Sequence, residues 1–119
     1  MEELMQEGKS LYQFPFRLVW KWVETSDSQY PAQVAFSVPK RRHKKAVTRN
    51  HIKRKIKEVY RTNKNILYNQ LTSQNKKIDL MFIYTANEIV PFREMMERQI
   101  SIMRKLEGKL NEKGVENLS

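Results

Sequence analysis

The sequence predicts an α/β or α+β two-layer sandwich that includes a long basic helix and a C-terminal helix. Apolar residues alternate with a period of two in residues 14–24 and 33–38, and residues 78–85 are apolar on both faces; these patterns indicate three strands. Apolar residues recur at helical spacing in residues 46–71 and 91–110. Because a helix lies between strands that can pair, the helices are expected to pack on a sheet whose strand order stays open.

The N-terminal third is expected to contain the end of a helix followed by two strands. Residues 1–10 are interpreted as the last part of a helix that closes at Gly8, since glycine is a common stop. The strand at 33–38 ends before a proline, which lacks the N–H that a ladder needs. In the strand at 14–24, the face expected to be buried carries Phe16, Leu18, Trp20 and Trp22.

The remaining two thirds are expected to form two helices around a third strand. The strand at 78–85 is expected to be central because both of its faces are apolar. Pro91 suits the first turn of the last helix, and residues from 111 on are expected to be frayed. The apolar stripes comprise Ile52, Ile56, Val59, Ile66, Leu67 and Leu71 in the first helix, and Phe92, Met96, Ile100, Met103, Leu106 and Leu110 in the second.

Length and composition indicate a single domain over residues 1–119. A chain of 119 residues with 39% apolar residues suits one core and is too apolar for a disordered tail. No apolar run approaches the roughly 20 residues that span a bilayer, so no membrane partner is expected. The absence of cysteine and of a secretory signal pattern fits the cytoplasm, which is the expected location.

The net charge of +10 is concentrated in residues 40–64. This stretch has twelve basic residues and one acid, Glu58, which leaves eleven of the 23 basic and twelve of the 13 acidic residues for the rest of the chain. Concentrated charge is typical of a docking surface for a polyanion. The alternative is an ordinary solvated helix face, but such a face carries acids at i,i+4 spacing and only Glu58 is available.

The stretch is therefore interpreted as a phosphate-binding loop that runs into a helix with a basic face. Lysine supplies a point charge, and arginine grips phosphate with two hydrogen bonds. If about six to ten of these groups meet phosphates, affinity should fall about 10³–10⁵-fold between about 50 and 200 mM salt. The residues expected to bind RNA are Lys40, Arg41, Arg42, Lys44, Lys45, Arg49, Asn50, Lys53, Arg54, Lys57 and Arg61.

A second candidate surface is the mixed face of the first two strands. It is too polar for a core and too smooth for a usual sheet exterior, so it is expected to floor a shallow groove for a single strand of nucleic acid. An aromatic side chain at the edge would stack a base. The residues assigned to this groove are Tyr12, Phe14, Arg17, Val19 and Lys21.

The chain offers few groups for catalysis, which needs a converging base, nucleophile or metal. Its two histidines, His43 and His51, both lie in the basic stretch, and its two aspartates, Asp27 and Asp79, are expected to be far apart. A histidine acting as general base is the less favoured alternative. No catalytic residue, metal ligand, protein-bound cofactor or small-molecule substrate is therefore expected.

The string AVTRNHIKRKIKEVYR at residues 46–61 resembles the RNR signature of the bacterial ribonuclease P protein subunit. The preceding VAFSVPKR resembles the strand before that signature, and the resemblance covers about residues 5–108. The positions that match the signature by identity are Arg49, Asn50, Ile52, Lys53 and Arg54.

The sequence departs from the family pattern at three places. His51 stands where the signature has a second arginine, so the contact made there should be weaker or pH-sensitive. The loop at 41–45 lacks the usual glycine and is a residue longer. The family begins with a basic stretch and a complete helix, of which only residues 4–8 remain, so we expect a truncated form with one wall of the leader cleft incomplete.

The resemblance implies a protein that binds the catalytic ribonuclease P RNA and the 5′ leader of precursor tRNA, while RNA-held Mg²⁺ carries out cleavage. It also implies a small mixed sheet with an unusual left-handed βαβ crossover. The rivals are a ribosomal or general RNA-binding protein, a helix-turn-helix DNA binder and a self-sufficient nuclease. Carried over by position, Arg49, Asn50, Lys53 and Lys57 meet RNA and leader beside the cleft, whereas Arg54, Arg61 and the 40–45 loop face the RNA subunit.

Overall fold

The computed structural model describes residues 8–23 and 30–118, with side chains as far as Asn111. The expected helix end therefore lies mostly outside the described residues. No helix among those described is both long and apolar enough to cross a membrane. The elements in chain order are β1 (Lys9–Gln13), β2 (Phe16–Val23), β3 (Ala32–Ser37), α2 (Ala46–Asn63), α3 (Asn65–Gln74), β4 (Lys77–Tyr84) and α4 (Phe92–Leu118).

The strands form one mixed sheet in the order β1-β2-β4-β3. Strand β4 pairs antiparallel with β2 and parallel with β3, so the expected central position of this apolar strand is confirmed. The parallel pair β3–β4 is joined through α2 and α3, which makes the predicted βαβ unit; the left hand of its crossover stays an expectation. The mixed α+β sheet fold is therefore the one predicted.

The first strand corrects the expectation for residues 1–10. Lys9 and Ser10 belong to β1 rather than to a helix end, and β1 pairs antiparallel with β2 across a turn with a cis Phe14–Pro15 peptide bond. The expected strand at 14–24 thus begins at Phe16. Strand β1 escaped prediction because it is short and mostly exposed, with only Leu11 packed against the core.

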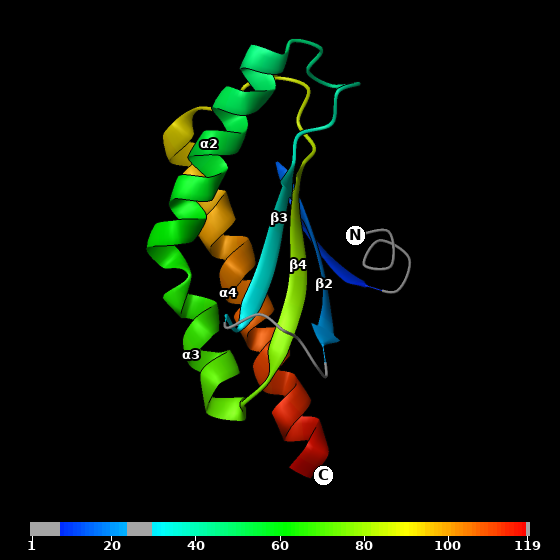
Figure 1. Cartoon of the computed structure of the whole chain (residues 1–119), viewed down its shortest axis with the longest axis vertical. Coiled ribbons are helices and arrows are strands. Elements are labelled where there is room, and N and C mark those ends of the chain that lie inside the picture. The colour runs from blue at the N-terminus through cyan, green and yellow to red at the C-terminus, as the bar shows by residue number, and fades with distance from the viewer. Residues whose placement is uncertain (1–7, 24–29, 119) are drawn as a thin grey trace.

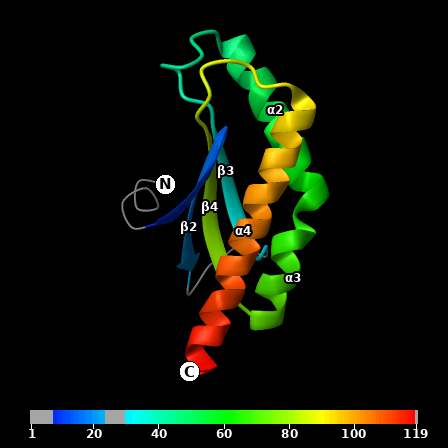
Figure 2. The ribbon, with the colours of Figure 1, turned by 180° about the vertical axis from the view of Figure 1, so that it is seen from behind.

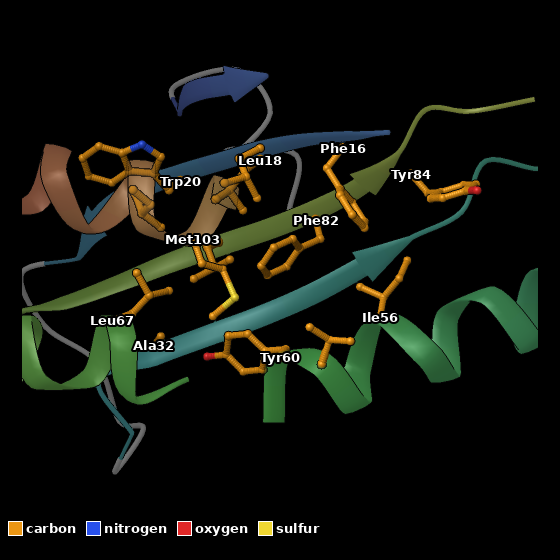
Figure 3. Close-up of a cluster of buried hydrophobic side chains, with 14 of the residues drawn as sticks. Phe16, Leu18, Trp20, Ala32, Ile56, Tyr60, Leu67, Phe82, Tyr84 and Met103 are labelled. Atoms are coloured by element: carbon orange, nitrogen blue, oxygen red, sulfur yellow. The ribbon is translucent and has the colours of Figure 1, made fainter. Parts of the chain in front are cut away.

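The three helices cover one face of the sheet, as Figures 1 and 2 show from opposite sides. The core lies between these layers, and its largest members come from β2, β4, α2, α3 and α4 (Figure 3). An aromatic cluster forms its centre. The rings of Phe82 and Phe36 stack with centroids 5.6 Å apart, and Phe16 and Tyr60 meet Phe82 edge-on.

The single helix expected over 46–71 is two helices, α2 and α3, which meet at Lys64. The side chains of Thr62 and Asn63 bond to the carbonyl oxygens of Val59 and Glu58 and so compete with the helical ladder there. Helix α3 then runs on to Gln74 and ends at Asn75, whose left-handed φ of 52° closes it. Local side-chain hydrogen bonds therefore explain the break.

Helix α4 differs from expectation at both ends. It continues through Leu118, where fraying was expected from residue 111. Its buried face includes Met95 and the polar Gln99, whereas Phe92 is 41% exposed, because the stripe is rotated toward Met95 at the first turn. Met103, Leu106 and Leu110 are buried as expected, while Met96 and Ile100 pack only partly against the core.

Replacing Tyr60 with phenylalanine is expected to stabilise the fold by about 1 kcal/mol near neutral pH. The Tyr60 hydroxyl is buried without a hydrogen-bond partner of normal geometry among the described residues, and an unsatisfied group of this kind costs about 1–3 kcal/mol. Burial, helped by the nearby Tyr68, raises the pKa of Tyr60 far above its ordinary value.

That raised pKa adds a pH dependence to the same prediction. The unfolded chain loses the Tyr60 phenolic proton near pH 10, before the folded chain does. The free energy of unfolding therefore does not change through this group below about pH 10, and it falls as the pH rises above that value. Urea unfolding at about pH 7 and pH 10.5 should therefore show a larger advantage of the Tyr60→Phe variant at the higher pH. An equal advantage at both pH values would contradict the burial of this hydroxyl.

Candidate nucleic-acid interface

Helix α2 presents its predicted RNA-binding side chains on the side that faces away from the sheet. Ile52, Ile56, Val59 and Tyr60 are buried against the sheet. The opposite side is polar, and the flank is half-buried, as the helical spacing predicts. Asn50, Arg54, Lys57 and Arg61 are exposed, and Arg49 and Lys53 lie on the flank.

Few acids neutralise this surface. Among residues 8–23 and 30–111, the ion pair of Arg61 with Glu58 is the only one formed by the predicted RNA-binding cations. The hydrogen bonds from Arg61 lower the pKa of Glu58, and those to Glu58 raise the pKa of Arg61. An exposed pair of this kind contributes little stability and opens readily, so the surface keeps a large positive excess.

The loop before α2 is fixed in place by His43. The imidazole is 7% exposed, and its Nε2–H donates to the carbonyl oxygen of Ala86 at 2.8 Å, across 43 residues of sequence. Its ring centroid lies 5.7 Å from that of Tyr84. The backbone N–H groups of Arg42 and His43 both donate to the carbonyl of Pro39, which turns the loop tightly. His43 therefore anchors the loop to the segment after β4.

Two arginines complete this attachment, which we call the loop clamp (Arg42, His43 and Arg49 with their partners). The Nη1 group of Arg49 donates to the carbonyls of His43 and Lys44, both at 2.9 Å. Arg42 donates to the side chain of Asn87 at 2.9 Å. Each of these two arginines thus uses its Nη1 group within the protein, which leaves the other guanidinium nitrogens available. The loop cations that remain exposed are Lys40, Arg41, Lys44 and Lys45.

The segment that receives the clamp is ordered by Tyr84. Its hydroxyl donates to the carbonyl of Glu88 and accepts from the N–H of Val90, both at 2.9 Å. Burial raises the pKa of Tyr84, although the hydrogen bond from Val90 opposes this. The 85–91 segment is therefore held around a core side chain and supports the loop at 40–45.

The described residues contain no evident catalytic constellation. His43 is occupied by its bond to Ala86, which disfavours it as a general base, and His51 is exposed on α2. No group of three or more histidine, aspartate and glutamate side chains within the described part of the chain could hold a metal ion. Asp79 lies within β4, and Asp27 lies outside the described residues. The described side chains that gather on α2 and its loop are cations, the type of group that meets a polyanion.

The predicted groove residues lie on the sheet face that the helices leave uncovered. In register, Tyr12 pairs with Arg17, Arg17 with Ile83, and Ile83 with Ser37, which forms one row across all four strands. Tyr12 is 61% and Phe14 is 44% exposed, so both rings are open to a ligand. This row lies at the end of the sheet where β3 leads into the loop at 40–45, so the two predicted surfaces adjoin there.

Val19 and Lys21 fit the groove less well. Val19 is only 1% exposed, which corrects its assignment to an open groove floor: alternation placed it on the correct face, but burial leaves no surface for a ligand. Lys21 is half-buried at the far end of the sheet, where it pairs in register with Asp79. The accessible part of the groove is therefore the end that contains Tyr12, Phe14 and Arg17.

Replacing Arg49 with lysine is expected to lower the free energy of unfolding by about 1–2 kcal/mol, because both carbonyl bonds are lost while the charge is kept. RNA affinity should also fall, but its salt dependence should not change, since no charge is removed. Urea unfolding and salt titrations measure the two effects. Arg54→Lys is the matched control on the exposed face, and equal stability of both variants would contradict a structural role for Arg49.

Sequence reasoning missed the partners that position the interface. Ala86, Asn87 and Tyr84 carry no local signal because they meet the loop only through the fold. Gln99 did carry one: it is a polar residue at a core position of α4. It is fully buried, and its Nε2 donates to the carbonyl of Ile56 at 2.8 Å, which fixes α4 to the basic helix.

Comparisons with solved structures agree on the fold. The ribonuclease P protein from Thermotoga maritima superimposes with a TM-score of 0.67 at 23% identity, covering 86% of each chain. The Staphylococcus aureus ribonuclease P protein gives a TM-score of 0.64 at 19% identity, covering 88% of this chain and 85% of that one. At these identities the likeness shows a shared fold.

Sequence comparisons extend the likeness to the family. A ribonuclease P protein component from Porphyromonas gingivalis is 27% identical over 111 residues, which are 93% of this chain and 80% of that protein. One from Chlorobaculum tepidum is 39% identical over 80 residues, or 63% of this chain and 52% of that protein. The family described as Ribonuclease P matches residues 2–107, nearly the whole sequence. The chain therefore belongs to the ribonuclease P protein family.

Proposed function

We propose that this chain binds the catalytic RNA of bacterial ribonuclease P and the 5′ leader of precursor tRNA. Family membership makes it a subunit of that ribonucleoprotein endoribonuclease, which processes tRNA. The protein holds the two RNAs together, and Mg²⁺ held by the RNA subunit carries out the cleavage. This work takes place in the cytoplasm.

The observation that carries the proposal is the excess of unneutralised cations on α2 and its clamped loop. The exposed cations of the loop and of the outer face of α2 have no carboxylate partner among the described residues, apart from the pair of Arg61 with Glu58. Cations crowded in this way repel one another in the free protein, and binding to RNA phosphates relieves that repulsion. The clamp fixes the loop before RNA arrives, so less ordering entropy is lost on binding.

The leader is assigned to the open end of the sheet. Tyr12 and Phe14 offer exposed rings that can stack unpaired bases, and Arg17 lies beside Tyr12 in register to meet the backbone. Because this end adjoins the clamped loop, one extended strand can pass from the sheet face toward the RNA held by α2. The geometry therefore supports two neighbouring RNA contacts with different chemistry.

A reconstitution assay tests the proposal against the rival of a general RNA-binding protein. The chain is mixed with a bacterial ribonuclease P RNA and precursor tRNA at low Mg²⁺, and mature 5′ ends are measured. Stimulation that requires both RNA subunit and protein supports the proposal. RNA binding without stimulation would favour the rival, and cleavage by the protein alone would overturn the assignment of catalysis to RNA.

A further inference from the structure

A hollow of about 460 Å³ lies where the start of α4 meets the flank of α2. Figures 1 and 2 both show these two segments side by side, on the side of the molecule away from the sheet's open face. Its volume falls within the ~300–1,000 Å³ of typical small-ligand sites. Four residues line the hollow: Phe92 and the charged Arg54, Lys55 and Glu58. The atoms that face the hollow are nevertheless mostly carbon.

Phe92 is the feature of the hollow that the fold does not require. Its ring is 41% exposed, because Met95 rather than Phe92 begins the buried stripe of α4. The ammonium of Lys55 lies 5.6 Å from the ring centroid, a cation–π distance. The ring is thus partly exposed and has a cation over one of its faces.

The charges around the ring indicate what kind of ligand fits. Two cations, Arg54 and Lys55, line the hollow beside one acid, Glu58, so the rim is net positive. A suitable ligand has a flat apolar part and an anionic part, which describes a nucleotide. Arg54 also belongs to the exposed basic face of α2, so RNA docked on that face already lies at the rim.

We propose that this hollow binds one unpaired nucleotide of the RNA that docks on α2. Its base stacks on Phe92, and its phosphate is met by Lys55 and Arg54. Stacking on an aromatic side chain tolerates any base, so the site adds affinity without reading sequence. The inference rests on the proposed RNA binding and adds a site on the helical layer, separate from the sheet groove.

The test compares Phe92→Leu with the unchanged chain in binding ribonuclease P RNA across a salt series. Leucine fills similar space but cannot stack, so affinity should fall about tenfold while the salt slope stays unchanged. Phe92→Tyr keeps the ring and should restore affinity. Tyr30→Leu is the matched control, since it removes a ring that is 60% exposed but does not line the hollow, and it should change affinity less than about twofold.

The outcomes separate this inference from the proposed function. If the unchanged chain does not bind the RNA, the proposed function fails. If that chain binds and Phe92→Leu binds equally well, only the nucleotide site fails. Loss of affinity in both Phe92→Leu and Phe92→Tyr would also overturn the nucleotide site. A third result would overturn it too: sedimentation showing that two copies of the unchanged chain associate and that Phe92→Leu abolishes this association. Unfolding curves for each variant ensure that folded protein is compared.

Discussion

Replacing Lys53, Arg54 and Lys57 together with glutamine is expected to lower affinity for ribonuclease P RNA about 10²-fold at about 0.15 M salt. Each phosphate contact contributes ~0.9 to the slope of log affinity against log salt, which is about fivefold in affinity at this salt concentration. Three contacts therefore give about 10²-fold and a slope lower by about 3. Glutamine is a good helix former, so α2 should persist.

The matched control is a second triple variant, in which three exposed cations of α4 are replaced together with glutamine: Arg98, Arg104 and Lys105. It removes the same charge from the same protein, so any general effect of net charge appears in both variants. Salt titrations of RNA binding measure both slopes. Equal slopes for the two triple variants would show that RNA meets the charge of the whole molecule rather than a face of α2.

The basic face of α2 could be predicted from sequence because helical spacing and local charge are properties of neighbouring residues. Ile52, Ile56 and Val59 mark one side, and the excess of lysine and arginine then has to lie on the other. The central strand β4 was predictable for the same reason, since Leu80 and Phe82 are buried on one face and the apolar Met81 and Ile83 are half-buried on the other. Features that follow from helical or strand periodicity can therefore be predicted from the sequence.

The features that failed prediction depend on contacts that a local pattern does not contain. Strand β1 exists because β2 offers it a partner, and the break at Lys64 depends on how two polar side chains bond to the preceding turn. The loop clamp joins His43 to Ala86 across 43 residues. As a result, the sequence pointed to Arg42 and Arg49 as ligands for RNA, whereas the fold also uses them to hold the loop that carries the free cations.

Replacing Phe82 with alanine is expected to lower the free energy of unfolding by about 3–5 kcal/mol. The Phe82 side chain is fully buried in the central strand, and its ring meets Phe36, Phe16 and Tyr60, so its removal leaves a cavity shared by β2, β3 and α2. Because domains of this size have roughly 5–15 kcal/mol in total, the variant should be only marginally folded.

Urea unfolding followed by tryptophan fluorescence measures this loss, because both tryptophans lie in β2 beside the core. Ile83→Ala is the control, since Ile83 is half-buried on the other face of the same strand and should cost less. If ribonuclease P RNA binds the folded chain as proposed, RNA at about 100 times its dissociation constant should restore about 2.7 kcal/mol to Phe82→Ala. If RNA rescues the folding of Phe82→Ala but not of a variant that also lacks the α2 cations, then the stabilisation comes from RNA bound at those cations.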